Sequence, residues 1–139
     1  MDIRPLDQSL SASPQVTPED LQSIAARGYG AVISNRPDGE TPDQPSAAEI
    51  ATAAKAAGLE FRHIPVVGGA MGEADVAAFQ AALTDLPGPI LGFCRTGTRT
   101  ATLWALARKD EQSADALIAT AKAAGYDLAG LRPRLEGTV

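Results

Sequence analysis

Hydrophobic positions along this sequence alternate between short continuous runs and positions three or four residues apart. Continuous runs such as 31–34 and 90–93 are typical of strands buried on both faces. The wider spacing is typical of helices with one buried face. Predicted strands cover residues 10–13, 31–34, 59–66 and 90–93, and predicted helices cover 18–27, 47–57, 73–83, a stretch through 103–106, 113–124 and a short piece within 127–135. This alternation predicts an α/β fold, with a central, mostly parallel sheet of roughly four or five strands flanked by helices.

Capping residues support the boundaries of three of these helices. Side-chain oxygens of Ser and Thr accept the free N–H groups of a first helical turn, and glycine often ends a helix. The expected caps are Thr17, Ser46 and Ser113 at the N-termini and Gly28, Gly58 and Gly125 at the C-termini. In sheets of this kind ligands bind beyond the carboxyl ends of the strands, where the loop after residue 93 is expected to lie.

The composition limits the core and the number of domains. The chain has 139 residues, which fits a single domain over residues 1–139. Aromatic residues make up only 4% of the chain, and 27 alanines dominate its hydrophobic content of 45%. We therefore expect a core of short side chains and closely packed helices.

Charge and cysteine content exclude several classes of function. The net charge of −5 argues against nucleic acid or an anionic membrane as a partner. No apolar run approaches the roughly 18 residues of a membrane span, and no secretory signal is visible. One cysteine and one histidine leave no internal disulfide or structural zinc site, so we expect no metal and no cofactor. These features predict a cytoplasmic protein of undetermined oligomeric state.

One segment, Cys94-Arg95-Thr96-Gly97-Thr98-Arg99, has a spacing that suggests chemistry. A cysteine ends a predicted strand, and an arginine opens a helix four residues after the cysteine. The positive end of a helix and nearby guanidinium groups favour the thiolate, which is the nucleophilic form. Gly97 allows backbone N–H groups to turn inward around an anion, and Arg99 can bind two oxygens of that anion at once.

These considerations assign candidate roles, each with a structural alternative. We expect Cys94 and Arg99 to be catalytic, although an isolated cysteine is often an inert core residue. The expected substrate-binding residues are Arg95, Thr96, Gly97, Thr98, Thr100, Arg36 and Asp38. The last two follow a predicted strand and close over the site, unless Pro37-Asp38-Gly39 is a simple turn. His63 is a switchable base or, more simply, a structural histidine, and Asp75 is a displaced general acid or a helix-start acid.

The loop and its surroundings resemble known families. The loop itself resembles the active-site loops of cysteine phosphatases and of rhodanese sulfurtransferases. The stretches Ser34–Glu40, Phe61–Val66, Asp75–Phe79 and Phe93–Thr100 resemble the phosphatase-like domain of beta-lactamase hydrolase-like proteins, over roughly residues 3–110. This resemblance implies a fold like that of the dual-specificity phosphatases.

Three departures from the phosphatase pattern favour sulfur chemistry. Four residues rather than five separate Cys94 from Arg99, Phe93 stands where a histidine is usual, and residues 67–71 contain no acid. We therefore expect a rhodanese-type sulfurtransferase that forms a Cys94 persulfide from thiosulfate or a small persulfide and passes the sulfur to a thiol acceptor. One alternative is a phosphatase that forms a phosphocysteine on a phosphate-type oxyanion. Another is a non-catalytic module that senses redox state or persulfides, or that binds anions.

Overall fold

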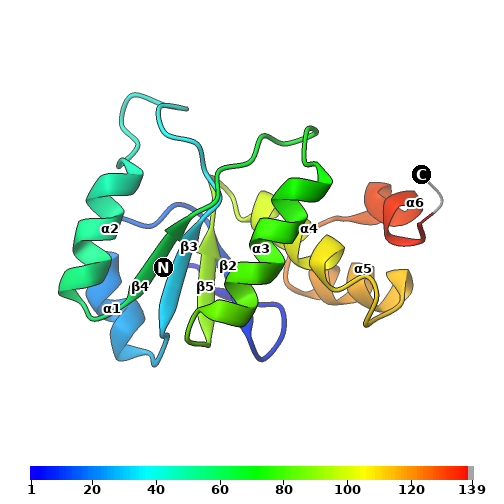
Figure 1. Ribbon diagram of the computed structural model, residues 1–139, viewed down its shortest axis with the longest axis horizontal. Helices are drawn as coiled ribbons and strands as arrows, with labels where there is room; N and C mark the ends of the chain where they lie inside the picture. The colour runs from blue at the N-terminus through cyan, green and yellow to red at the C-terminus, as the bar shows by residue number, and fades with distance from the viewer. Residues whose placement is uncertain (138–139) are drawn as a thin grey trace.

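The computed structural model describes residues 1–137 and shows one twisted sheet between two layers of helices (Figure 1). The strands are β1 (Arg4–Pro5), β2 (Leu10–Ser13), β3 (Ala31–Ser34), β4 (Glu60–His63) and β5 (Ile90–Phe93). The helices are α1 (Asp20–Ala26), α2 (Ala47–Ala56), α3 (Glu73–Asp85), α4 (Thr98–Ala107), α5 (Ala114–Ala123), a 3₁₀ turn η1 (Ala129–Leu131) and α6 (Arg132–Leu135). None of the described helices is long and apolar enough to cross a membrane.

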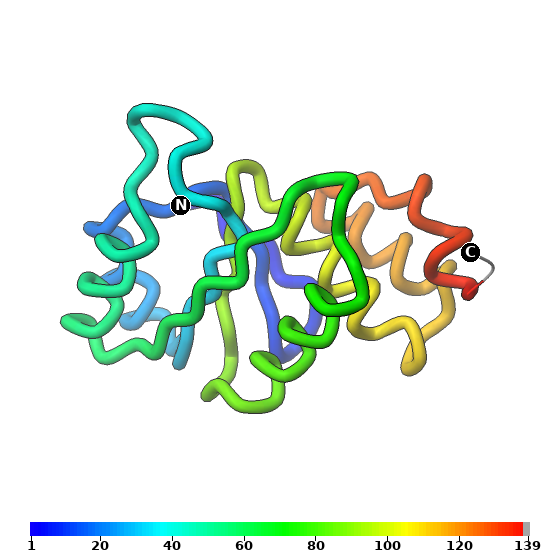
Figure 2. The backbone as a smooth tube through the Cα atoms, turned by 45° about the horizontal axis from the view of Figure 1, so that its top comes forward, coloured from blue at the N-terminus to red at the C-terminus, as the bar shows by residue number. Residues whose placement is uncertain are grey.

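The sheet has the order β1-β2-β5-β3-β4, and only β1 runs antiparallel to its neighbour. The last residues of the parallel strands are in register: Phe93 of β5 pairs with Ser13 and Ser34, and Ser34 also pairs with His63. The loops that follow these four strands therefore leave the sheet at one edge. Figure 2 shows the chain segments after β3 and β4 rising above that edge on either side of the loop after β5.

Alternating strand residues divide the core into two parts. Val32 and Leu91 point to a cluster formed with α1 and α2, whereas Ile33 and Ile90 point to a larger cluster with α3, α4 and α5. Because helices cover both faces, β2, β3 and β5 are buried at every position. This double burial explains why their sequences read as continuous apolar runs.

The predicted α/β class and mostly parallel sheet are confirmed, and two strands differ from the prediction. The fourth strand is shorter than residues 59–66, because the chain leaves the sheet after His63. Two-residue β1 was not predicted, since a pair ending in proline carries no periodic signal. The caps at Ser46 and Ser113 are confirmed.

The cap expected at Thr17 is wrong. The first helix begins at Asp20, and its N-cap residue makes no side-chain hydrogen bond. The backbone N–H of Asp20 donates to the Thr17 carbonyl at 3.0 Å, which closes a turn before the helix. The Asp20 carboxylate in turn accepts from the Thr17 N–H at 2.9 Å. The expected cap is therefore reversed: the Asp20 side chain accepts from the Thr17 backbone, and the Thr17 side chain does not cap the helix.

Close contact between α4 and β5 depends on Gly92. A Cβ at this position would lie 2.6 Å from Cγ2 of Thr100, on the first turn of α4. Thr100 is fully buried, so its side chain cannot move aside to make room for an added Cβ. The missing side chain therefore sets how closely the helix that carries Arg99 approaches the sheet.

We expect Gly92→Ala to lower the free energy of unfolding by about 1–3 kcal/mol, because the added methyl group overpacks this contact. The double variant Gly92→Ala/Thr100→Ser removes Cγ2, keeps the hydroxyl and should recover part of the loss. Gly130→Ala is the control, since nothing lies within 4 Å of its added Cβ, and it should change stability by less than about 0.5 kcal/mol. Urea unfolding measures all three, and equal losses in the single and double variants would contradict the assigned contact.

Candidate active site

Cys94 lies at the carboxyl edge of the sheet, directly after β5, and is 1% exposed. The chain turns back at Gly97, whose φ of 100° is strained for any residue with a side chain. This turn points the Gly97 N–H at Sγ of Cys94, 3.0 Å away, and α4 begins at the next residue. The thiol therefore receives a backbone hydrogen bond at the positive end of a helix, an arrangement that stabilises a thiolate.

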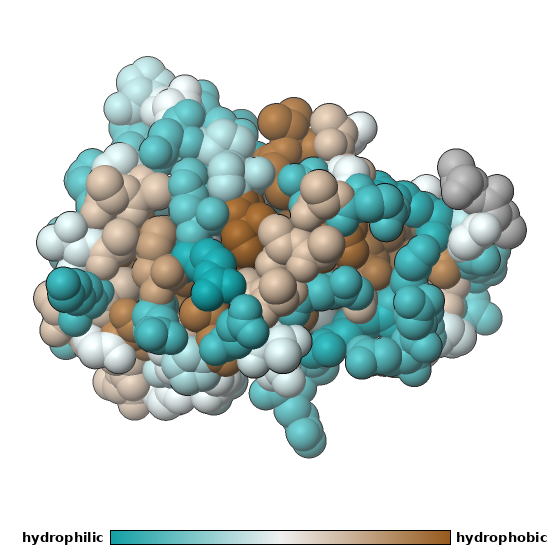
Figure 3. Space-filling view, viewed as in Figure 1, coloured by the Kyte–Doolittle hydropathy of each residue, from teal (hydrophilic) through white to brown (hydrophobic). Residues whose placement is uncertain are grey.

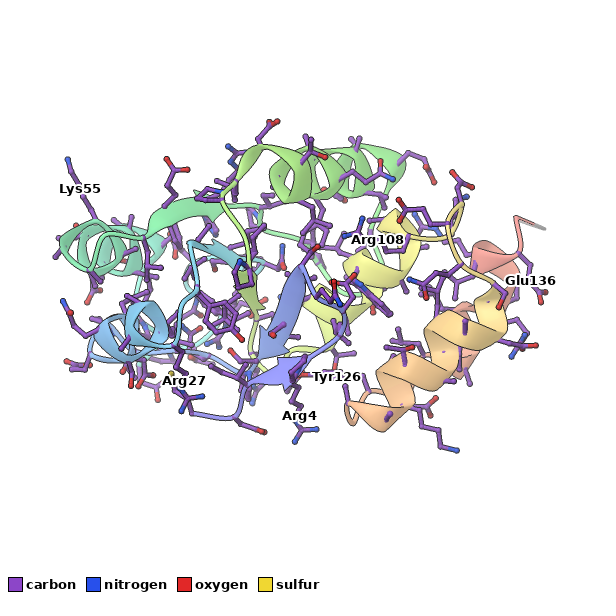
Figure 4. The ribbon with its side chains drawn as sticks, turned by 90° about the horizontal axis from the view of Figure 1, so that it is seen from below. Arg4, Arg27, Lys55, Arg108, Tyr126 and Glu136 are labelled. Carbon is purple, nitrogen blue, oxygen red and sulfur yellow. The ribbon has the colours of Figure 1, made fainter. Side chains whose placement is uncertain are left out.

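Tyr126, which follows α5, supports this turn from behind. Its hydroxyl lies where a Cβ on Gly97 would be, so the ring and the loop are in close contact. The hydroxyl is buried and has no hydrogen-bond partner among the described residues, and burial raises the pKa of Tyr126. Arg4 lies over the ring, 5.7 Å from its centroid, as Figure 4 shows from below. The segment after α5 thus contacts the loop that holds Cys94.

Glu40 orients the Arg99 side chain. Nη1 of Arg99 donates to Oε2 of Glu40 at 2.7 Å, and Nη2 donates to Oε1 at 2.9 Å. Nη1 also donates to the Val66 carbonyl at 3.2 Å. The Arg99 hydrogen bond holds the pKa of Glu40 at about 2, and the pKa of Arg99 is raised, first by Glu40 and further by the Cys94 side chain. The guanidinium is therefore fixed by an ionised carboxylate within the electrostatic reach of the nucleophile.

Arg36 completes this ion-pair network. Its guanidinium is 5% exposed and donates to Glu40 at 2.9 Å, to Gln15 at 2.9 Å and to Thr41 at 3.3 Å. Glu40 thus lies between two guanidinium groups. The structure brings Arg36 to the site, where it acts on the carboxylate that orients Arg99.

Asn35 joins the segments that meet at this edge. It is fully buried, and its side chain donates to the Ile64 carbonyl at 3.0 Å and accepts from the Thr100 hydroxyl at 2.8 Å. Its backbone bonds the carbonyl of Phe93 and the N–H of Val66. One amide therefore links the ends of β3, β4 and β5 to the first turn of α4.

The remaining predicted residues divide into two groups. Arg95, Thr96 and Thr98 are exposed on the loop, and the hydroxyl of Thr96 donates to that of Thr98 at 3.1 Å. Thr100 instead points inward to Asn35. Asp38 is not brought to the loop: its carboxylate accepts the N–H of Ala47 at 2.8 Å, at the start of α2.

The acid and base candidates hold structural positions. Nε2 of His63 donates to the carbonyl of Arg36 at 2.8 Å. Asp75 accepts the Gly72 N–H at 2.9 Å in the first turn of α3. Glu40, the carboxylate bound to Arg99, is ionised far below neutral pH. The structure thus gives the candidate acids and bases no role at Cys94.

Sequence reasoning missed Asn35, Glu40 and Tyr126. The first two lie in the stretch 34–40 that carried the family resemblance, and this was the only available signal for them. Tyr126 lies about thirty residues after the loop, and no local pattern connects the two.

Within residues 1–137 no three His, Cys, Asp or Glu side chains cluster as metal ligands do. The chemistry that the site offers is a cysteine sulfur near an oriented guanidinium, which suits nucleophilic attack on an oxyanion.

Comparison with known proteins identifies the family of the chain. The family model of the beta-lactamase hydrolase-like protein, phosphatase-like domain, matches residues 2–111. A beta-lactamase hydrolase-like protein from Xylella fastidiosa strain Temecula1 is 37% identical over 130 residues, which are 92% of this chain and 30% of that protein. One from Agrobacterium fabrum is 39% identical over 101 residues, 73% of this chain and 23% of that protein. The chain thus spans less than a third of these relatives.

Solved structures show the same fold. A phosphatase candidate from Neisseria meningitidis is 38% identical, covers 100% of this chain and 99% of its own, and gives a TM-score of 0.90. The core catalytic domain of the PP-IP phosphatase SIW14 from S. cerevisiae, in complex with citrate, gives 0.73 at 17% identity, over 98% of this chain and 84% of its own. Kinase associated phosphatase gives 0.72 at 14% identity, over 99% and 92%. These matches confirm a fold like that of the dual-specificity phosphatases.

The expected sulfurtransferase activity is wrong, because the family match and these neighbours point to a phosphatase-like protein. The expectation rested on three departures from the phosphatase pattern: the four-residue spacing between Cys94 and Arg99, Phe93 in place of a histidine, and the absence of an acid in residues 67–71. In the structure Gly97 closes the turn onto Sγ, and Glu40 sets the position of Arg99, so the spacing alone does not determine which anion fits. The match over residues 2–111 shows that the chain belongs to the family of the phosphatase-like domain of beta-lactamase hydrolase-like proteins.

Proposed function

We propose that the protein is a cysteine-dependent phosphatase. The observation that carries the proposal is the pairing of a buried Cys94 sulfur, hydrogen-bonded by Gly97, with an Arg99 guanidinium fixed by Glu40. The same pairing of nucleophile and anion-binding group serves attack on a phosphoryl group. The phosphatase-like relatives and neighbours support this choice of substrate class.

The hydrogen bonds of Arg99 leave one edge of its guanidinium for a substrate. Nη1 uses both of its N–H groups on Glu40 and Val66, and Nη2 uses one on Glu40. No oxygen of the described residues accepts from the N–H of Nε or from the second N–H of Nη2, and a hydrogen bond with the Cys94 side chain contributes to the raised pKa of Arg99. These two parallel donors match two oxygens of a phosphoryl group. Glu40 therefore binds the Nη1 and Nη2 end of the guanidinium and leaves the side that carries Nε for the substrate.

The reaction proceeds in two displacements. Sγ of Cys94 attacks phosphorus, an S–P bond forms, and the P–O bond to the leaving group breaks with its electron pair on that oxygen. Water then attacks the phosphocysteine and loses a proton to solvent. The S–P bond breaks, and its electron pair restores the thiolate. Arg99 and loop N–H groups bind the oxygens that carry charge in both steps.

The leaving group must depart without an acid from the β4–α3 loop. Residues 64–72 contain no carboxylate, and Glu40 is ionised. An alkoxide therefore leaves slowly, whereas an aryl oxide or another stable anion needs no proton. We infer a substrate whose leaving group is a stable anion, and a reducing compartment such as the cytoplasm, where Cys94 stays a free thiol.

We expect the protein to hydrolyse 4-nitrophenyl phosphate. We expect its rate with an alkyl phosphate of similar size to be about 10²–10⁴-fold lower than the rate of a phosphatase that has a general acid. Cys94→Ser should reduce both rates to that of the uncatalysed reaction, since the hydroxyl is a poor nucleophile at neutral pH. Initial rates of phosphate release, with circular dichroism to confirm folding, measure this. Undiminished turnover by Cys94→Ser would reject the assigned nucleophile.

We also expect a defined pH dependence of stability from Glu40. Its folded pKa of about 2 lies below the ordinary value of 4.5, so its contribution is complete above about pH 4.5 and disappears as the pH falls toward 2. Thermal melting of wild type and Glu40→Gln should show a constant difference in Tm from pH 7 to 5. That difference should shrink between pH 4.5 and 2. A difference that disappears near pH 6 would contradict the assigned ion pair.

A further inference from the structure

A pocket of about 260 Å³ lies beside Arg99, between the β4–α3 loop and the C-terminal helices. Its walls include Gly68, Met71, Arg99, Thr102, Leu131 and Arg134. This volume is slightly below that of typical ligand pockets and suits one arm of a substrate. Figure 1 shows the β4–α3 loop and α6 on either side of α4, and the N-terminal half of α4 lines the pocket between them. The pocket opens next to the guanidinium that binds the phosphoryl group.

Arg134 brings a second positive charge into this pocket. It comes from α6, outside the residues 2–111 that match the family model. Leu135 is buried and Leu131 packs against the same core, so the short helix is anchored on both sides of Arg134. Packing therefore holds the backbone of α6 beside the pocket, although the segment is short.

The charge of Arg134 is only weakly compensated. Its Nη2 lies 3.6 Å from Oε1 of Glu73, and the Glu73 side chain is 85% exposed. An exposed ion pair at that distance contributes little and gives way to a better placed anion. By contrast, Nη1 of Arg132 on the same helix lies 2.7 Å from Asp115 and 3.3 Å from Glu136.

We propose that Arg134 is a specificity-determining residue that binds a second anionic group of the substrate, on the part that leaves after attack by Cys94. The substrate class is then a phosphate monoester with a further carboxylate or phosphate on its leaving group. The proposal rests on the phosphatase function above. Uncharged parts of the leaving group would contact the hydrophobic surface of the β4–α3 loop, where Val67 is 61% exposed and where Figure 3 shows hydrophobic residues gathered.

Two aryl phosphates with similar leaving groups test this. 4-Methylumbelliferyl phosphate has no second charge, and its analogue with carboxymethyl in place of methyl has one. Wild type should show a KM about 5- to 10-fold lower for the carboxylated substrate, a preference that decreases with salt. Arg134→Gln should abolish the preference, because the KM of the carboxylated substrate rises to that of the uncharged one.

Matched variants separate this role from general charge and from stability. Arg132→Gln removes the same charge from the same helix and should keep the preference, whereas Glu73→Gln frees Arg134 and should strengthen it. Equal KM values for both substrates in wild type would overturn the proposal. Loss of the preference in Arg132→Gln as well as in Arg134→Gln would also overturn it. So would a preference that is lost in Arg95→Gln and kept in Arg134→Gln.

A binding measurement distinguishes failure of this proposal from failure of the phosphatase function. Phenylphosphonate and 4-carboxyphenylphosphonate are not hydrolysed, and their dissociation constants follow from titration by NMR. Tighter binding of the carboxylated compound, lost in Arg134→Gln, together with no turnover of either ester, would reject the phosphatase function and retain the anion subsite. Turnover of both esters with equal binding of the two phosphonates would retain the phosphatase function and reject the anion subsite.

Discussion

The site depends on one carboxylate that holds two guanidinium groups. Glu40 binds Arg99 through both of its oxygens and also accepts from the buried Arg36. Without Glu40, Arg36 would be a buried charge with only neutral partners, and Arg99 would be free to move away from Cys94. The loss is greatest at Arg36, whose buried charge would keep no ionic partner, whereas the partly exposed Arg99–Glu40 pair contributes less to stability because solvent screens it. The two Glu40 oxygens bind Nη1 and Nη2 of Arg99 and leave the side of the guanidinium that carries Nε for a phosphoryl group.

A second constraint brings these groups together. Parallel strands in register end at one edge, and Asn35 links the chain there to α4. Gly92 allows α4 to pack closely on β5, and Gly97 turns the loop so that its N–H meets the sulfur. Each feature is local, and together they fix the nucleophile and the anion-binding group in one rigid frame. Precise placement of this kind is what a reaction without an added acid depends on most.

Sequence alone could predict the parts of this site that are contiguous in the chain. Cys94, Gly97 and Arg99 lie within six residues, so their relation to a strand end and a helix start was visible from composition and spacing. The alternation of apolar runs likewise predicted the sheet and most helices. Asp38 was placed by proximity in sequence, and the structure instead uses it to cap α2.

The parts that could not be predicted depend on contacts between distant segments. Glu40 meets Arg99 across 59 positions of sequence, and Tyr126 reaches Gly97 from beyond α5. The expected sulfur chemistry rested on the four-residue spacing, on Phe93 and on the acid missing from residues 67–71, whereas the position of Arg99 is set by a distant carboxylate that none of these features shows. The C-terminal helices also lie outside the matched family region, so no family pattern indicated that they line a pocket beside Arg99.

The most direct test is detection of the covalent intermediate. Wild-type protein is mixed with 4-nitrophenyl phosphate, quenched by denaturation within milliseconds and digested for peptide mass spectrometry. A phosphoryl group on the peptide that contains Cys94, formed in a burst and lost on further incubation, is the result expected of a thiolate bound by Gly97 and paired with Arg99. Steady turnover with no phosphoryl group on Cys94 at any time would contradict the account.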